Sequence, residues 1–206
     1  SPLDGRYASK LNDLEQYFSE FALIKNRVLV EINWLIFMSR TKSLSFIPAL
    51  SKNKENSLLK VIDNFSIKDA EQIKKIEAKT NHDVKAVEIF IGKKLESLNL
   101  NKYREFVHLF CTSEDINNLS YSLMLKGYLD NEFKEINSTL LKDLKSKSKK
   151  WSKLAMLSFT HGQTASPTTL GKEIANFHER IKFHLNLLKS LNPSGKFNGA
   201  VGNYNA

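Results

Sequence analysis

The stretch from Glu114 to Leu157 limits the possible folds more than any other feature, because it is long and almost free of helix-breaking residues. It contains no proline and a single glycine, Gly127. Glycine and proline are scarce overall, with 8 and 4 among 206 residues, which favours long helices over a turn-rich β fold. One helix over this stretch would hold about 36 to 44 residues and measure roughly 55–65 Å. Such a helix needs neighbours of similar length, so the sequence predicts an all-α fold.

Apolar periodicity predicts further helices before and after this stretch. A helix is expected over residues 12–40, with an apolar stripe made by Leu14, Phe18, Phe21, Val28, Ile32 and Leu35. Shorter helices are expected over 52–64 and 66–80, the second opened by a capping box of Ser66 and Asp69. The seam of a last helix is formed by Leu170, Ile174, Phe177, Ile181, Leu185 and Leu188.

The expected starts of two helices matter for the chemistry. Asp83 is predicted as the N-cap of a helix that follows residue 80. Ser166 is predicted as the cap of the last helix, with Pro167 at its first position. His161 would then lie in an irregular segment just before a helix N-terminus. No strand pair with a hairpin turn is expected.

Charge and composition argue against several kinds of partner. The net charge is +9, but the lysines are scattered, and their densest cluster, over 142–150, lies in a helical stretch with few aromatic residues. Nucleic acid is therefore not the expected partner. No run of about 18 apolar residues could span a membrane, and no signal peptide is visible. The single cysteine, Cys111, fits a reducing, cytoplasmic location and is most simply a small buried residue.

Residues able to carry chemistry lie in four interruptions of the helical pattern: Arg6-Tyr7, Asn81-His82-Asp83, Thr112-Ser113 and Thr160-His161-Gly162-Gln163. The last three are predicted to lie at helix N-termini, whose unpaired N–H groups attract carboxylates and phosphates. Two histidines add groups that titrate near neutral pH. Any one of these three, taken alone, would be interpreted as an ordinary helix cap. Together they fit a small, multiply anionic substrate handled by acid–base chemistry.

Motifs for other chemistries are missing from the sequence. There is no dinucleotide-binding or phosphate-loop motif, and no histidine–carboxylate spacing suited to a metal. We therefore expect neither a cofactor nor a metal ion.

Five segments carry a resemblance to a known family: SPLDGRY (1–7), TNHDVKAVE (80–88), CTSEDINNLS (111–120), THGQTASPTTLGKE (160–173) and NGAVGNYNA (198–206). In their order and spacing they resemble the bacterial form of the adenylosuccinate lyase family, within the fumarase/aspartase superfamily. The resemblance covers the whole chain. The segments CTSEDINNLS and THGQTASPTTLGKE alone would indicate only the superfamily. The segment TNHDVKAVE argues against the sibling family of argininosuccinate lyases.

The resemblance implies a β-elimination that releases fumarate from a nucleotide. The substrates would be adenylosuccinate, which gives AMP, and the succinylated aminoimidazole carboxamide ribotide of purine biosynthesis. His161 would be the general acid that protonates the departing nitrogen, and His82 would assist near the substrate phosphate. The implied substrate-binding residues are Arg6, Tyr7, Asn81, His82, Asp83, Thr112, Ser113, Thr160 and Gln163. Arg6 and Tyr7 would bind the nucleotide, and Thr112 and Ser113 would bind a carboxylate of the succinyl part. Gln163 would contact the substrate near the reacting bond.

The resemblance also implies a domain organisation and an assembly. Residues 1–110 would form a helical N-terminal domain, and residues 111–206 the first long helices of a central helical bundle in a homotetramer with shared active sites. The family's flexible loop, which carries the serine thought to be the general base, has no counterpart here. Phe159 and Thr164 stand where the family often has arginine and proline. The alternative from another class is a basic helical interaction module without catalysis, which predicts no affinity for nucleotides.

Overall fold

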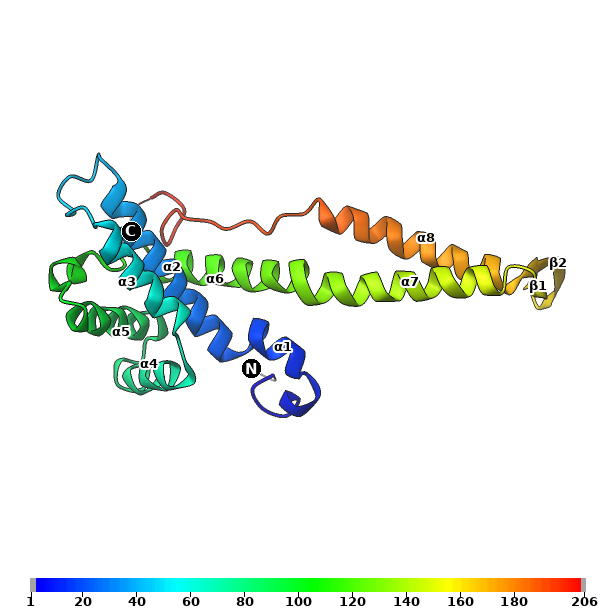
Figure 1. Cartoon of the computed structure of the whole chain (residues 1–206), viewed down its shortest axis with the longest axis horizontal. Coiled ribbons are helices and arrows are strands. Elements are labelled where there is room, and N and C mark those ends of the chain that lie inside the picture. The colour runs from blue at the N-terminus through cyan, green and yellow to red at the C-terminus, as the bar shows by residue number, and fades with distance from the viewer. Residues whose placement is uncertain (1–2, 205–206) are drawn as a thin grey trace. The chain divides into compact units, whose positions relative to one another are not determined.

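The computed structural model describes residues 3–204, and in them it is helical apart from one pair of strands, as Figure 1 shows. The α-helices are α1 (Asn12–Phe18), α2 (Glu20–Arg40), α3 (Lys52–Asp63), α4 (Ile67–Thr80), α5 (Asp83–Ser97), α6 (Ser113–Tyr128), α7 (Lys134–Lys150) and α8 (Leu170–Lys189). The other elements are the 3₁₀ helices η1 (Ala8–Lys10) and η2 (Asn101–Phe106), the π-helical η3 (Leu129–Phe133), and the strands β1 (Ala155–Thr160) and β2 (Gln163–Thr169). The all-α prediction is confirmed. The expectation that no hairpin exists is wrong.

Two compact units make up the chain. The first comprises the residues up to Gly127 together with the segment from Pro193, and the second runs from Tyr128 to Asn192. The division expected from the resemblance, between residues 110 and 111, stays a prediction.

The core of the first unit is built on α2, against which α3, α4 and α5 pack. Its central residues are apolar and fully or almost fully buried: Val28, Ile32, Leu35, Met38, Leu58, Ile73, Phe90 and Leu95. A second, smaller cluster consists of Val30, Val84, Cys111 and Ile116. This second cluster joins α2 to the first turns of α5 and α6, beside two of the four candidate segments. The prediction that Cys111 is buried is confirmed.

A break at Ser19 replaces the single helix predicted over 12–40 by α1 and α2. Ser19 is extended, with ψ 165°, and its hydroxyl accepts a hydrogen bond from the N–H of Ala22 at 3.1 Å. This N-cap satisfies one of the free N–H groups of α2, so a new helix starts where the periodicity alone continues. The predicted capping box is confirmed, because Asp69 Oδ2 accepts the N–H of Ser66 at 3.0 Å.

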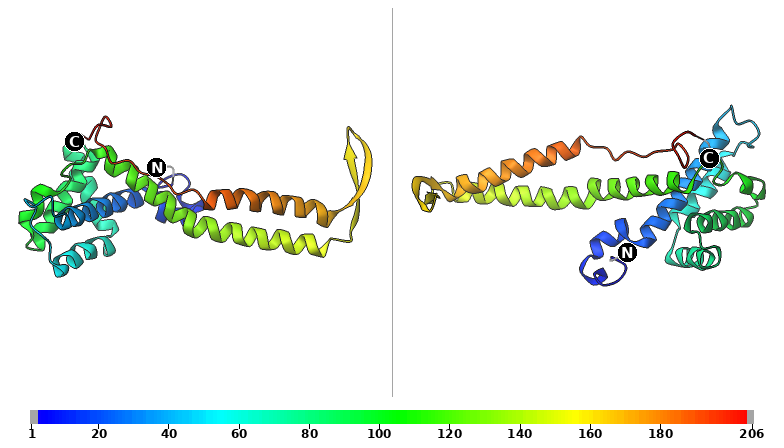
Figure 2. Two further views of the ribbon diagram at one scale, coloured as in Figure 1. Left: turned by 90° about the horizontal axis from the view of Figure 1, so that it is seen from above. Right: turned by 180° about the vertical axis from the view of Figure 1, so that it is seen from behind.

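The second unit is a pair of long helices joined by the strands; α7 and α8 lie side by side in both views of Figure 2. Gly171, at the start of α8, allows this close approach. A Cβ at Gly171 would lie 2.3 Å from the carbonyl oxygen of Ser148 and 2.6 Å from the backbone nitrogen of Ser152. The helix predicted over 114–157 is found as α6, η3 and α7 in succession. It ends at Lys150 because the chain then pairs as β1.

The strands form an antiparallel hairpin with a two-residue turn. Thr160 pairs with Gln163, and His161 and Gly162 occupy the turn with φ 51° and 71°. Positive φ at both central positions defines a type I′ turn, whose twist matches that of the strands. Glycine adopts this conformation readily, and histidine is among the residues that tolerate it.

The hairpin corrects the predicted start of the last helix. Pro167 lies in β2 opposite Leu157, and α8 begins at Leu170. Thr169, rather than Ser166, is the N-cap, and its hydroxyl accepts a backbone N–H of the first turn at 3.2 Å. Proline is tolerated because each strand of a two-stranded sheet has an unpaired edge. His161 therefore lies at the tip of a hairpin and not beside a helix N-terminus.

Candidate functional site

The first candidate segment lies between α4 and α5. Asn81 ends α4 with a left-handed φ of 51°. His82, and not Asp83, is the N-cap of α5, because its Nδ1 accepts the N–H of Lys85 at 3.1 Å. An accepting Nδ1 carries no proton, so the neutral ring holds its proton on Nε2. The side chain is 51% exposed, which leaves this Nε2–H able to donate to an anion at the N-terminus of α5.

The second candidate segment opens α6. Thr112 and Ser113 are half-buried, and within residues 3–204 neither hydroxyl has a hydrogen-bond partner. The N–H of Thr112 donates to Asp115 Oδ2 at 2.9 Å, and the N–H of Asp115 donates to the carbonyl of Thr112 at 3.0 Å. The contact from the Thr112 N–H to the Asp115 carboxylate is one half of a capping box, while the N–H of Asp115 is bonded to a backbone carbonyl instead of the Thr112 hydroxyl. It fixes the backbone at the helix N-terminus while both hydroxyls stay available to a ligand.

Asp115 is a site residue that the sequence analysis did not single out. Its completely buried carboxylate accepts four hydrogen bonds. Oδ1 accepts from Lys196 Nζ at 2.9 Å and the N–H of Asn198 at 3.1 Å, and Oδ2 accepts from the N–H groups of Thr112 at 2.9 Å and Gly199 at 3.2 Å. Burial opposes ionisation, but Lys196 and the backbone donors outweigh it and lower the pKa of Asp115. Asp115 thus anchors the end segment of the chain beside Thr112.

A buried arginine on α2 joins the two candidate segments. Arg27 Nη2 donates to Asp83 Oδ2 at 2.6 Å, and its Nε donates to Asn117 Oδ1 at 2.9 Å. Asp83 is the first residue of α5 and Asn117 lies near the start of α6, so the N-termini of these helices are held close together. Burial opposes ionisation of Asp83, but the charge of Arg27 outweighs it and lowers the pKa of that carboxyl. The geometry gives Asp83 a structural partner, and its contact with substrate stays a prediction.

The sequence analysis also missed a glutamate–histidine pair close to Thr112. Glu31 lies one turn after Arg27 on α2, its side chain is 0% exposed, and its Oε1 is 2.6 Å from Nδ1 of His108. Burial would lower the pKa of His108, but the hydrogen bond and charge of Glu31 outweigh it and raise this pKa. A glutamate within a buried helix stretch is the signal that could have located the pair, because buried acids need partners.

Arg6 and Tyr7 are not connected to these segments. The Arg6 guanidinium carbon lies 5.5 Å from the centre of the Tyr7 ring, and both residues are exposed. In the part of the chain that the structure describes, no hydrogen bond, ion pair or ring contact joins them to residues 81–83 or 112–113. Their contact with a nucleotide stays a prediction.

The remaining candidate residues belong to the second unit, where they form the tip of the hairpin. Thr160, His161 and Gln163 are all exposed. The Thr160 hydroxyl oxygen lies 2.9 Å from Nδ1 of His161. In the imidazolium form, which is the form able to give up a proton, Nδ1–H would donate to this hydroxyl and Nε2–H would face outward. The candidate residues therefore lie in three places: residues 81–83 with 112–113 and, separately, Arg6-Tyr7 in the first unit, and the hairpin tip in the second unit.

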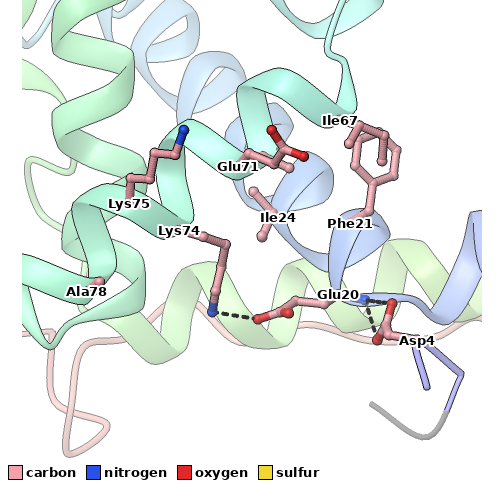
Figure 3. A pocket seen from close by; sticks show the side chains of 10 residues that line it. Asp4, Glu20, Phe21, Ile24, Ile67, Glu71, Lys74, Lys75 and Ala78 are labelled. Atoms are coloured by element: carbon pink, nitrogen blue, oxygen red, sulfur yellow. Dashed lines mark hydrogen bonds and ion pairs between the residues drawn. The ribbon is translucent and has the colours of Figure 1, made fainter. Parts of the chain in front are cut away.

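An open groove lies elsewhere in the first unit, between α2 and α4, with a volume of about 460 Å³ (Figure 3). Phe21 and Ile24 contribute apolar walls, and Lys74 forms an ion pair with Glu20 at 2.7 Å. Both carboxylate oxygens of Asp4 accept the N–H of Glu20 at 3.1 Å. None of the predicted site residues lines this groove, so the groove is not part of the candidate site.

Neither a metal centre nor a membrane span is found in residues 3–204. No group of three or more His, Cys, Asp or Glu side chains there is placed to hold a metal ion. In the same residues, no helix combines the length and apolar character that a membrane span requires.

Comparison with known proteins identifies the family of this chain. Residues 5–206 match the family described as Lyase, and the chain belongs to this family. Two solved structures share its fold. A fumarate lyase from Mesorhizobium sp. BNC1 has a TM-score of 0.74 at 17% identity, and the alignment covers 94% of this chain and 43% of that one. A 3-carboxy-cis,cis-muconate lactonizing enzyme from Pseudomonas putida has a TM-score of 0.71 at 18% identity with the same coverage of 94% and 43%.

Among curated proteins the similarity is to adenylosuccinate lyases. The enzyme of Haemophilus influenzae is 45% identical over 207 residues, which cover 100% of this chain and 45% of that protein. The enzyme of Escherichia coli strain K12 is 43% identical with the same coverage of 100% and 45%. The chain thus spans 45% of the length of these relatives and corresponds to their N-terminal part. The resemblance noted in the sequence is confirmed.

Proposed function

We propose that this chain supplies the N-terminal part of an adenylosuccinate lyase. The reaction is a β-elimination that releases fumarate from adenylosuccinate, giving AMP, and from the succinylaminoimidazole carboxamide ribotide of purine biosynthesis. The observation that carries the proposal is the 45% identity to the Haemophilus influenzae enzyme over the entire chain.

His161 is the proposed general acid. In the elimination a base takes a proton from a succinyl carbon, the carbon–nitrogen bond breaks, and a double bond forms in fumarate. The nitrogen must gain a proton as it departs. Supporting this role, His161 lies on an exposed turn, and the Thr160 hydroxyl contacts its Nδ1 at 2.9 Å, which leaves Nε2 for the transfer. Gln163, on the same hairpin, is proposed to contact the substrate near this bond.

The anionic parts of the substrate are assigned to the helix N-termini of the first unit. We assign the phosphate region to Asn81 and His82, because the Nε2–H of His82 is available beside the start of α5. A succinyl carboxylate is assigned to the unpartnered hydroxyls of Thr112 and Ser113. Arg6 and Tyr7 are proposed to bind the nucleotide and Asp83 to border it. The general base is proposed to lie outside these residues.

Exposed apolar side chains support a larger assembly. On α7 and α8 of the second unit they are Ile136, Leu140, Phe177, Phe183, Leu187 and Leu188. Helices that leave such residues in solvent normally pack against further helices. We propose that they are covered within a bundle shared by a homotetramer, in which each active site combines several subunits. A cytoplasmic location is proposed for the same enzyme.

The experiment that tests this function replaces His161 in a version of the protein extended to the length of its relatives. His161→Gln keeps hydrogen bonding and approximate size but cannot deliver a proton. General acid catalysis contributes about 10²–10⁴-fold in rate, so kcat for adenylosuccinate should fall by that factor while substrate binding weakens far less.

His178 provides the matched control. It lies within α8, with its Nδ1 2.8 Å from Oε1 of Glu179. His178→Gln should cost much less than His161→Gln. If His161→Gln kept more than about a tenth of kcat, the loss would be smaller than general acid catalysis allows, and the acid would be sought at His82.

A further inference from the structure

One face of α2 carries polar side chains that reach the segments around the candidate site. Arg27, Glu31 and Trp34 follow one another at spacings of four and three residues, which places them on one side of the helix. Arg27 holds the starts of α5 and α6 through Asp83 and Asn117. Glu31 contacts Nδ1 of His108 at 2.6 Å, and Trp34 Nε1 donates to the carbonyl of Leu109 at 2.8 Å. The last two contacts fix the loop that leads into α6.

The burial of Glu31 calls for an explanation. Its side chain is 0% exposed, and its Oε2 has no hydrogen-bond partner among the residues that the structure describes. A buried carboxylate opposes folding unless a cationic partner compensates it. That partner is His108, whose own side chain remains 20% exposed and whose backbone adopts a left-handed φ of 64°. An apolar residue at position 31 could be buried in α2 without needing a cationic partner.

The position of His108 connects Glu31 to the site. His108 lies four residues before Thr112, and the charges of Lys85 and Glu88 on α5 act on its ring. With Nδ1 held by Glu31, Nε2 is the ring nitrogen that no group within residues 3–204 engages. The tautomer and direction of the ring are therefore set from α2.

We propose that Glu31 is a positioning residue of the lyase site: its buried carboxylate fixes Nδ1 of His108 and holds the loop before Thr112, so that Nε2 of His108 faces the anionic substrate. The inference rests on the proposed function. It assigns Glu31 no contact with the substrate.

Kinetics of single and double variants test the role, in the protein extended to its relatives' length. Glu31→Gln keeps the size of the side chain but removes the charge that holds the His108 ring. A hydrogen bond to a charged group is worth about 10- to 100-fold, so kcat/KM for adenylosuccinate should fall by that factor. Because Glu31 acts through His108, adding Glu31→Gln to His108→Gln should cost no more than about twofold further. Multiplicative losses would overturn the proposal, because they would indicate a general structural effect.

Glu55 offers a matched control for the loss of a buried carboxylate. Its side chain is 5% exposed and pairs with Arg40 at the other end of α2. Glu55→Gln should leave kcat/KM within about twofold of the unaltered protein. A loss as large as that of Glu31→Gln would overturn the specific role of Glu31.

A titration that does not depend on activity tests the pair itself. In the same protein with ¹³C-labelled histidine, the resonance absent from His108→Gln is that of His108. Its midpoint should lie above the usual value of about 6.5 in the unaltered protein and should fall in Glu31→Gln, since the raising effect of the Glu31 carboxylate is then lost. An unchanged midpoint would refute the interaction of Glu31 with His108 but would leave the proposed function intact. If the unaltered protein were inactive, the proposed function would be refuted and, with it, the positioning role of Glu31.

Discussion

Replacing Asp115 by asparagine should release the end segment of the chain from α6. The carboxylate accepts two hydrogen bonds on each oxygen, from Lys196 and Asn198 on Oδ1 and from Thr112 and Gly199 on Oδ2. Asparagine keeps one accepting oxygen, and its NH₂ group would face two N–H donors. Two lost bonds to a charged group amount to about 3–6 kcal/mol. Breaking a buried ion pair costs about 3–5 kcal/mol, so the two estimates agree.

Only part of this lost free energy should destabilise the rest of the first unit. Most of it should favour opening of the end segment, residues 193–204, because few other contacts hold that segment in place. Asn118 exchanges two hydrogen bonds with the backbone of Lys196, at 3.0 and 2.6 Å, and Ser122 donates to the carbonyl of Ser194 at 2.6 Å. The ring of Phe197 lies 4.4 Å from that of Trp34. We therefore expect the segment to open locally before the helical core unfolds.

Amide hydrogen exchange, measured by mass spectrometry on peptides from residues 193–204, is the suitable assay. A loss of about 3–5 kcal/mol corresponds to exchange faster by roughly 150- to 5,000-fold at the amides of Asn198 and Gly199. Asp143→Asn is the control, because Asp143 is 54% exposed and pairs with Lys147 on the surface of α7. Exchange in 193–204 that changes less than threefold, or equally in both variants, would refute the reasoning.

The pH dependence of the same protection follows from the lowered pKa of Asp115. A carboxyl with a lowered folded pKa stabilises the folded state at all pH values above its unfolded pKa of about 3.9. This contribution is lost as the pH falls through the lower folded value. After correction for intrinsic exchange, protection in 193–204 should hold down to about pH 4 and decline below it. Asp115→Asn should show no such decline.

Two further predictions concern the second unit and the completeness of the site. Gly171→Ala should destabilise the α7–α8 pair by about 1–3 kcal/mol in chemical denaturation, because the added Cβ would meet the backbone of Ser148 at 2.3 Å. Gly5→Ala, where no atom lies within 4 Å, should be nearly neutral, and equal effects of the two changes would contradict this packing. The 206-residue chain alone should release no detectable fumarate from adenylosuccinate, since its proposed general base lies elsewhere. Measurable release would place the base within these residues.

Local pattern and chemistry predicted most of the helices and the segments between them. The capping box of Ser66 and Asp69, the end of α4 at Thr80 and the start of α6 at Ser113 all depend on groups within four residues of one another. Helical periodicity and caps can therefore be read from a short window of sequence. For the same reason, the sequence alone predicts the candidate segments at 81–83 and 112–113.

The sequence analysis did not predict the hairpin because local signals in this segment favour two different structures, a helix start and a strand pair. Ser166 and Pro167 are typical of a helix start, but the pairing of β1 with β2 across His161-Gly162 replaces that start with a strand. A glycine in the second position of a two-residue turn was the available signal. Local preference alone does not decide between these outcomes, because the strand is stabilised by its partner.

By itself, the sequence determined the helical class and the family, and it predicted the segments proposed to carry chemistry. Only the tertiary structure decided which side chains hold those segments together. Arg27 reaches Asn117 across 90 residues, Glu31 reaches His108 across 77, and Asp115 reaches Lys196 across 81. Each is a buried charge whose partner lies far away in the sequence, on α6 or in a loop. A buried charged residue needs a partner whatever its neighbours in the sequence are, but only the tertiary packing selects which group that partner is.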